Sequence, residues 1–259
     1  MNKQAQAVVL FLVGAALLWA SLTGVYLRYV KAGLRPLLIG AGIVLIVAAV
    51  ATIWYELRPR LGARQKAADQ EHQEHGEHQE HGEHQEDEHH GHAHREPRVA
   101  WLLVLPLIAL ILISPPALGS YAASRAGTAL QPPLGFPPLV AGDPLPMTVV
   151  DYAERAVYDH GHSLQGRRVE ITGFISTGEP GGAPILTRMF FACCAADAAP
   201  IKVGLAGQVP AGLHADTWLQ VVGTFTDRQI KDVINGGPIP FIEVSQATPV
   251  PVPRDPYEV

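Results

Sequence analysis

AVVLFLVGAALLWASLTGVYL, residues 7–27, is the uncharged stretch that decides the fold of the N-terminal half. A helix needs about 20 mostly apolar residues to cross the hydrocarbon core of a bilayer, so this stretch predicts a membrane-spanning helix. The alternative is a secretory signal peptide. The apolar stretch is too long for one, however, and no A-x-A cleavage site follows it. The sequence therefore predicts an integral membrane protein.

Two further apolar runs extend this pattern. Residues 36–55, PLLIGAGIVLIVAAVATIWY, follow the first run closely, which predicts an antiparallel helical hairpin within residues 1–57. Residues 99–118, VAWLLVLPLIALILISPPAL, predict a third span. Its Pro106 is tolerated in a membrane helix when neighbouring groups satisfy the freed backbone. A buried helix of a soluble protein is the alternative for the third run, but three uncharged runs in one chain favour membrane spans.

Positive residues orient these three spans, because Lys and Arg are enriched in cytoplasmic loops. With three spans, the N-terminus and residues 58–98 share one side of the membrane. That side carries Lys3, Arg58, Arg60, Arg64, Lys66, Arg95 and Arg98, and the other carries Arg28, Lys31, Arg35 and Arg125. The distribution predicts a multi-pass protein with its N-terminus and second loop in the cytoplasm and its C-terminal domain outside.

A histidine-rich tract, EHQEHGEHQEHGEHQEDEHHGHAH, occupies residues 71–94 of the loop at 58–98. The tract is polar and contains glycines, so it predicts a disordered loop. Neutral imidazole binds zinc, copper and nickel, which predicts several weak sites for zinc or another transition-metal ion. The alternative is a solvated spacer, and no cofactor is required in either case. The candidate ligands are His72, His75, His78, His81, His84, His89, His90, His92 and His94.

The C-terminal half changes character. Residues 119–146 are rich in proline and predict an extended linker. Residues 147–248 predict a small soluble domain that begins with a helix at 148–159 and continues with short alternating strands at 168–176, 185–194, 201–205, 218–226 and 241–244. Five strands and one helix favour a mostly β domain of the OB type, a five-stranded barrel. Residues 249–259 predict an extended tail.

Adjacent cysteines, Cys193 and Cys194, are the sharpest local feature of this domain. Consecutive Cα atoms lie about 3.8 Å apart, closer than the roughly 4.4–6.8 Å of ordinary disulfides, so a bond between them would be strained. Three interpretations remain open. The pair binds a soft metal ion together with Asp197, His160, His162 or His214; it is redox-active; or it packs in the core.

The stretch at 188–200, RMFFACCAADAAP, resembles the signature of the YcgQ-like bacterial membrane proteins, which are described as permease subunits. The matching positions are Arg188, Phe190, Cys193, Cys194, Asp197, Ala198 and Pro200. Residues 166–174 and the three spans also fit this family, so the resemblance covers most of the chain. It implies a bacterial cell-membrane location, a larger polytopic permease as partner and a link to zinc homeostasis. It assigns no catalytic role to the signature residues.

These features predict a non-enzymatic auxiliary subunit of a permease, in contact with membrane lipid and metal ions. The alternative is a membrane-anchored thiol-redox or metal-transfer protein acting through Cys193 and Cys194. The chain lacks the G-x-x-x-x-G-K-[ST], G-x-S-x-G and H-E-x-x-H motifs, which argues against an enzyme. A net charge of -5 and few aromatic residues near basic ones argue against nucleic-acid binding.

Overall fold

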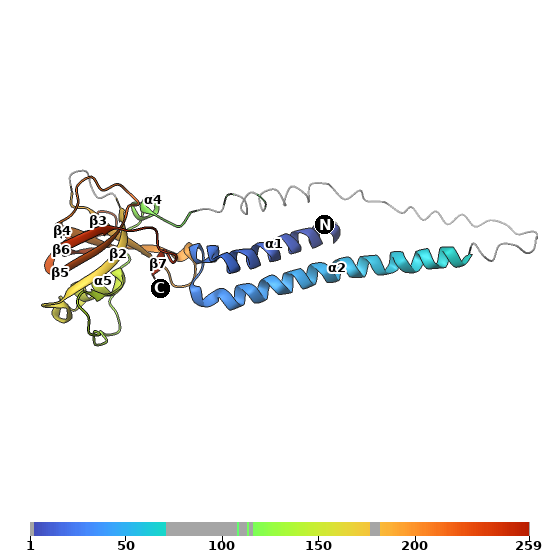
Figure 1. Ribbon diagram of the computed structural model, residues 1–259, viewed down its shortest axis with the longest axis horizontal. Helices are drawn as coiled ribbons and strands as arrows, with labels where there is room; N and C mark the ends of the chain where they lie inside the picture. The colour runs from blue at the N-terminus through green and yellow to red at the C-terminus, as the bar shows by residue number, and fades with distance from the viewer. Residues whose placement is uncertain (1–2, 71–107, 109–112, 114–115, 177–181, 259) are drawn as a thin grey trace, which may run out of the picture. The chain divides into compact units, whose positions relative to one another are not determined.

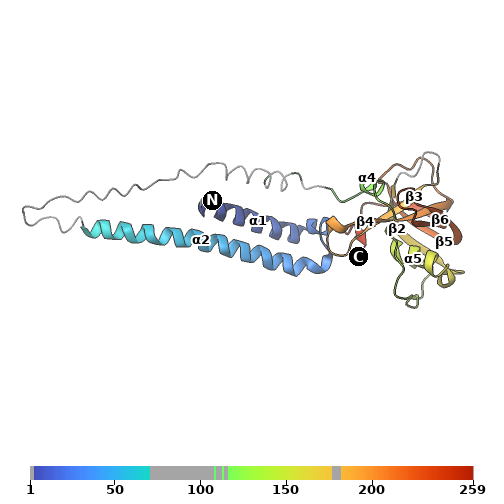
Figure 2. The ribbon, with the colours of Figure 1, turned by 180° about the vertical axis from the view of Figure 1, so that it is seen from behind.

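The computed structural model describes residues 3–70, 108, 113, 116–176 and 182–258, with the backbone alone for 3–5 and 56–70. The chain divides into two compact units. The first combines Met1–Thr23 with Pro36–Pro115, and the second combines Gly24–Arg35 with Pro116–Val259. Figures 1 and 2 show the elements of both units from opposite sides. The second unit therefore contains the whole soluble domain and also the loop that joins the first two helices.

The first unit contains two long helices, α1 (Lys3–Thr23) and α2 (Arg35–Gln70) (Figure 1). The stretches Gln6–Thr23 and Ala32–Tyr55 are long and apolar enough to cross a membrane, judged by length and composition. Only 17% and 11% of these stretches are buried within the structure, whereas a helix in the core of a soluble protein is apolar and buried all round. The two N-terminal helices are therefore candidate membrane spans.

The second helix extends beyond its apolar run. It continues to Gln70, so residues 58–70 are helical and do not belong to the expected disordered loop. The segment after the apolar run is rich in alanine, leucine, arginine and glutamine, which favour helix, and an existing helix extends at one hydrogen bond per residue. Residues 71–98, with all nine candidate histidines of the tract, lie outside the described residues. Most of the third apolar run, 99–118, lies outside them too.

Small side chains line the contact between α1 and α2. Buried small residues recur at every seventh position, namely Ala7, Gly14 and Ser21 in α1 and Gly42 and Ala49 in α2. A seven-residue repeat keeps one face of each helix toward its partner, and small residues let helix backbones approach closely in a membrane. A Cβ added to Gly14 would lie 2.9 Å from the carbonyl oxygen of Gly42. The hairpin therefore depends on glycine at this crossing.

Substitution of Gly42 by leucine should destabilise the hairpin. The new Cβ would lie 2.9 Å from Leu18 Cγ and 3.1 Å from the Gly14 carbonyl oxygen, so the helices must move apart. Gly40→Leu is the matched control, because a Cβ there meets nothing within 4 Å. Overpacking costs about 1–3 kcal/mol, so only Gly42→Leu should lower the thermal unfolding midpoint in detergent. Equal midpoints for the two variants would contradict the close crossing.

Five strands form a closed barrel in the second unit. Their bounds are β2 (Arg168–Ser176), β3 (Ile185–Phe190), β4 (Ala199–Gly207), β5 (Trp218–Lys231) and β6 (Pro238–Pro249). The strands pair in the order β2, β5, β6, β4, β3, and β3 pairs again with β2 to close the barrel. The β4–β6 pair is parallel and the others are antiparallel. The expected small barrel is confirmed, with the five-stranded architecture of the OB type.

The barrel interior is built from alternate strand positions. Val169 and Ile171 of β2 and Leu219 and Val221 of β5 are buried in one apolar cluster. This spacing follows from the two-residue period of a strand. Burying such side chains contributes roughly 1.5–3 kcal/mol each relative to leaving them exposed. The alternation read from the sequence therefore marks the barrel interior.

The helix α5 (Val149–Tyr158) packs on the same cluster as predicted (Figure 1). Its first turn is capped by Thr148, whose hydroxyl oxygen accepts a hydrogen bond from the Asp151 N–H at 3.0 Å. Such a cap satisfies one of the free amides at a helix start. Tyr152 is fully buried, and its hydroxyl donates to the carbonyl oxygen of Phe241 at 2.7 Å. The helix, which precedes the five strands in the sequence, therefore contributes directly to the core of their barrel.

The proline-rich segment expected as a linker has little regular structure, but it packs on the barrel. Its regular elements are the short helix α4 (Ser120–Ala123) and the two-residue strand β1 (Leu145–Pro146). The Ala129 N–H donates to the Pro200 carbonyl at 2.9 Å, and Leu130 is buried in the core. The C-terminal tail also returns, since β7 (Tyr257–Glu258) pairs in parallel with β3. The folded domain is therefore larger than residues 147–248.

Candidate metal centre

The two cysteines lie in the connection between β3 and β4. The sequence predicted a strand that included both, but β3 ends at Phe190, which pairs with Ala199 across the connection. Phe191 is buried in a second apolar cluster, and its N–H donates to the Glu258 carbonyl oxygen at 3.1 Å. The chain leaves the sheet at this point, where the pairing of β3 with both β4 and β7 ends. The cysteines are therefore freed from the alternating directions of strand side chains.

Cys193, Cys194 and Asp197 form one cluster of possible metal ligands. Their Sγ and carboxylate oxygen atoms all lie within 4.8 Å of one another. Cys193 is exposed, Cys194 is half-buried, and both are free thiols. A short helical turn, Ala195–Asp197, brings the aspartate back beside the cysteines. Two soft sulfur donors and one hard oxygen donor thus converge at the surface of the domain.

The Asp197 carboxylate also organises the backbone of this turn. Its two oxygens accept hydrogen bonds from the N–H groups of Cys193 and Cys194, at 3.2 Å each. Some desolvation works against its ionisation although the side chain is exposed, but the hydrogen bonds from the amides of Cys194 and Cys193 outweigh that effect and lower the pKa of Asp197. The carboxylate is therefore ionised at neutral pH. Each oxygen keeps a second lone pair with which it can bind a cation.

The Cys193 thiol has the opposite tendency. Its hydrogen bond with Cys194 is the largest effect that raises its pKa, followed by desolvation and the negative charge of Asp197, and the pKa reaches about 11. This thiol is therefore protonated at neutral pH, more fully than an ordinary cysteine, whose pKa is near 8.5. A bound cation reverses this balance, because a coordinated thiol loses its proton. The free site therefore holds thiols beside a carboxylate.

The donor set fits a thiophilic divalent ion. Zinc binds sulfur at about 2.3 Å and carboxylate oxygen at about 2.0–2.2 Å, so tetrahedral ligands lie roughly 3.5–3.8 Å apart. The 4.8 Å limit of this cluster needs only small side-chain rotations to reach that spacing. Three protein ligands leave one position open, whereas structural zinc sites use four. The geometry suits an ion that exchanges with another ligand.

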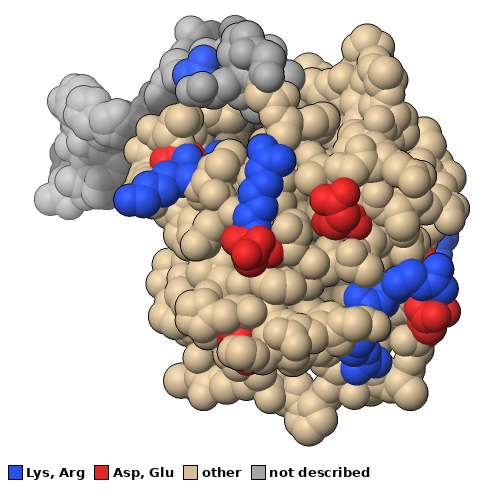
Figure 3. Space-filling view, turned by 90° about the vertical axis from the view of Figure 1, so that its left-hand side faces the viewer, with Lys and Arg blue, Asp and Glu red and all other residues tan. Residues whose placement is uncertain are grey.

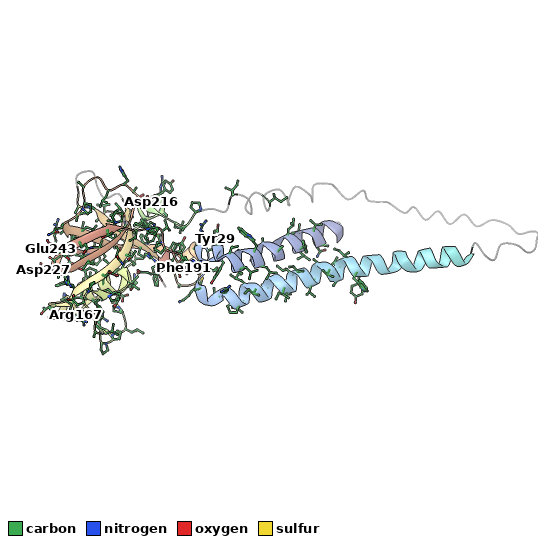
Figure 4. All side chains as sticks on the ribbon, in the orientation of Figure 1. Tyr29, Arg167, Phe191, Asp216, Asp227 and Glu243 are labelled. Atoms are coloured by element: carbon green, nitrogen blue, oxygen red, sulfur yellow. The ribbon has the colours of Figure 1, made fainter. Side chains whose placement is uncertain are left out.

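The loop between α1 and α2 lies against this cluster and belongs to the same compact unit. Two backbone hydrogen bonds join the two segments. The Lys31 N–H donates to the Cys193 carbonyl oxygen (3.2 Å) and the Ala195 N–H donates to the Tyr29 carbonyl oxygen (2.7 Å), and together they form an antiparallel bridge between Val30 and Cys194. Figure 4 labels Tyr29, which is in this loop, and Phe191, which begins the connection between β3 and β4. The cysteine segment is therefore paired with a segment far away in the sequence.

Arg188, a second signature residue, has a structural environment. It is buried, its guanidinium lies 4.8 Å from the centre of the Trp218 ring, and its Nη2 donates to the Asp255 carbonyl oxygen at 2.7 Å. Its Nε lies 3.9 Å from Glu258 Oε1. The side chain therefore fastens the C-terminal segment to β3 and is not part of the metal cluster.

Glu258 completes this arrangement. Its carboxylate accepts hydrogen bonds from the Val149 and Val150 N–H groups at 2.9 and 3.0 Å, at the start of α5. Burial raises the pKa of Glu258, although these amides and Arg188 favour its charged form. A carboxylate at a helix N-terminus is stabilised by the helix dipole. The residue links β7 to α5, and its role could not be read from the sequence.

The other candidates fall into three groups. Phe190 and Pro200 are in the sheet, where Phe190 is half-buried and Pro200 is buried opposite Met189. Among the described residues, no group of three or more His, Cys, Asp or Glu donors other than Cys193, Cys194 and Asp197 is close enough to hold one ion. His160, His162 and His214 therefore do not complete the centre. The histidines of the 71–94 tract lie outside the described part of the chain.

Sequence reasoning missed the residues that support the cluster from the α1–α2 loop. The tripeptide at 29–31 stands between two apolar runs, and it reads as part of a short connection. Its only local signal is an aromatic and a β-branched residue side by side, which favour an extended backbone. That signal does not identify the partner segment.

The match to a known protein family lies entirely within the second unit. Residues 143–258 match the family model described as the DUF1980 C-terminal domain. The match spans β1, α5, the five barrel strands, both cysteines and β7. No curated protein and no solved structure matches the chain. The barrel with its cysteine turn is therefore similar to DUF1980 C-terminal domains.

Proposed function

We propose that this chain is a membrane-anchored, non-enzymatic protein whose C-terminal barrel binds a thiophilic divalent metal ion, with zinc as the expected ion. The observation that carries the proposal is the convergence of Cys193, Cys194 and Asp197, whose ligand atoms lie within 4.8 Å of one another. The exposure of Cys193 and Asp197 allows an ion to enter and leave. Residues Arg188, Phe190 and Pro200 of the same signature support the sheet around the turn.

Metal binding accounts for the cluster better than thiol redox chemistry does. A redox-active cysteine requires a stabilised thiolate, whereas the pKa of Cys193 is raised to about 11. Metal binding displaces thiol protons and uses the carboxylate as a third ligand. The raised pKa of Cys193 therefore favours the metal-transfer form of the alternative function over its thiol-redox form.

The arrangement of the second unit supports a particular membrane topology. Residues 29–31 pair with the cysteine turn of the barrel, and residues 24–35 belong to the same compact unit, so this loop and the barrel lie on the same side of a membrane that α1 and α2 cross. The positive residues place that side outside the cytoplasm. The N-terminus and the histidine tract then lie in the cytoplasm. In this proposal the tract collects metal ions on one side, and the cysteine centre binds them on the other.

The proposed partner is a larger polytopic permease in the same bacterial cell membrane, as the YcgQ-like resemblance implies. Three spans are too few to enclose a substrate pathway, whereas an open metal coordination position suits transfer to or from a partner. Affinity purification of the full-length protein from its native membrane in mild detergent, followed by mass spectrometry, tests this. A stoichiometric polytopic protein is expected, and recovery of the chain without one would contradict the subunit role.

Nucleic acid is not proposed as a ligand. The barrel face in Figure 3 carries acidic and basic side chains interspersed among uncharged ones, and that face shows no continuous basic groove. Single-stranded nucleic acids are bound in a positively charged groove with aromatic platforms. The charge distribution of this face fits a protein that does not bind nucleic acid through it.

Titration of the full-length protein with Co²⁺ in detergent tests the metal centre. Cobalt occupies zinc-type sites, and thiolate ligation gives a charge-transfer absorption that histidine ligation does not. We expect this absorption to saturate when about one Co²⁺ ion per protein is bound by thiolate, regardless of how many further ions the histidine tract binds. Absence of the absorption would contradict the proposed function.

A further inference from the structure

The cysteine turn is held from two sides. Within the turn, Asp197 accepts the N–H groups of Cys193 and Cys194. From outside, the segment at 29–31 pairs with residues 193–195 through the bridge between Val30 and Cys194. The two flanking hydrogen bonds use the Cys193 carbonyl and the Ala195 N–H. The backbone on both sides of Cys194 is therefore fixed by the loop that joins α1 to α2.

This support acts on the positions of the metal ligands. The connection between β3 and β4 runs from Phe191 to Ala198, and the sheet restrains only its ends. Its middle contains the three ligands, which must stay within a few tenths of an ångström of the metal geometry. The pairing with residues 29–31 supplies that restraint without using a ligand atom. Loss of the pairing would leave the ligands present but less well ordered.

We propose that the segment Tyr29-Val30-Lys31 sets the metal affinity of the cysteine turn, so that metal binding and the position of the α1–α2 loop are energetically linked. This inference rests on the proposed metal-binding function. Coupling between two equilibria is reciprocal: a change that detaches the loop weakens metal binding, and bound metal holds the loop in place. Since α1 ends at Thr23 and α2 begins at Arg35, a partner that shifts these helices would change metal retention.

Substitution of Lys31 by proline tests the link. Lys31 has a φ of -57°, within the range of proline, and the preceding Val30 lies in a β-bridge, which proline also tolerates. The change therefore removes the N–H that donates to Cys193 without forcing a new backbone conformation. Lys31→Ala is the matched control, because it loses the same charge and keeps the N–H.

Co²⁺ titration of full-length protein, read by thiolate charge-transfer absorption, is the measurement. One hydrogen bond contributes about 0.5–1.5 kcal/mol net, so Lys31→Pro should bind Co²⁺ roughly two- to twelvefold more weakly than Lys31→Ala. Equal affinities of the two variants, with a wild-type protein that binds, would overturn the link and leave the metal centre standing. No thiolate absorption in the wild type would overturn both.

Hydrogen exchange of the wild-type protein gives a second measurement if the proline variant does not fold. Bound Co²⁺ should slow exchange of the Lys31 and Ala195 amides, because both donate across the pairing. An amide outside the pairing, such as that of Asp151 at the start of α5, should be unaffected. Unchanged exchange at Lys31 and Ala195 with metal bound would overturn the link.

Discussion

Serine at both Cys193 and Cys194 is expected to abolish thiolate-bound Co²⁺ in the full-length protein. The substitutions remove two of three ligands, and even loss of groups that only orient a ligand costs about 10–100-fold in affinity. Single Cys193→Ser and Cys194→Ser variants should each weaken binding by at least that factor. His214→Ala is the matched control, because His214 does not join the cluster. Undiminished thiolate absorption in the double variant would disprove the assignment of these ligands.

The pH dependence of this binding distinguishes the cysteine centre from the histidine tract. The Cys193 pKa of about 11 means that this thiol is protonated across the neutral range and must lose its proton to bind. Affinity at the centre should therefore rise with pH between 6.5 and 8.5, up to about tenfold per pH unit for each displaced proton. Histidines, with an ordinary pKa near 6.5, reach their neutral form by about pH 7.5. Binding that levels off there would indicate histidine ligation.

Replacement of Asp232 by alanine is expected to destabilise the barrel by about 3–5 kcal/mol, the usual cost of breaking a buried ion pair. The Asp232 side chain is 1% exposed, and its Oδ2 lies 2.8 Å from Lys202 Nζ. It also accepts hydrogen bonds from the Thr128 and Ile234 N–H groups, both at 2.9 Å. The substitution would leave a buried ammonium and two amides short of a partner, and it would remove one of the contacts that hold the proline-rich segment on the barrel, at Thr128.

Chemical denaturation of the full-length protein measures this loss. Asp227→Ala is the matched control, since it removes the same charge from an exposed position in β5. Lys202→Met combined with Asp232→Ala should recover part of the stability. Replacing both members of a buried ion pair by apolar groups costs less stability than removing one member and leaving the other charge unpaired. An Asp232→Ala variant as stable as Asp227→Ala would contradict the role of the ion pair.

Acid should have the same effect as the Asp232 substitution. Burial opposes ionisation of Asp232, but hydrogen bonds from Lys202, Ile234 and Thr128 outweigh it and lower the pKa of Asp232 below its usual 3.8. A carboxyl whose pKa is lower in the folded state stabilises the fold above its unfolded pKa. That contribution falls away as the pH drops below about 4 and through the folded pKa.

The largest features of the chain could be predicted from sequence because they depend on local patterns. The apolar runs at 7–27 and 36–55 predicted helices; α1 contains the first run as far as Thr23, and α2 contains the whole of the second. Alternation at Val169 and Ile171 predicted strands, and Thr148 predicted a helix start. Each of these signals lies within one element, where the period of side chains reports which face is buried. Boundaries were less accurate, since α2 continues to Gln70 and β3 stops at Phe190.

The sequence by itself determined two apolar N-terminal helices, a small β-barrel and an adjacent pair of cysteines with a nearby aspartate. Only the tertiary structure decided that the cysteines leave the sheet, that Asp197 turns back beside them and that Val30 pairs with Cys194. It also decided that Glu258 binds the start of α5 and that the proline-rich segment packs on the barrel. Such contacts join residues far apart in the chain. They arise from strand pairing and from the need to satisfy buried polar groups, neither of which leaves a periodic pattern in the sequence.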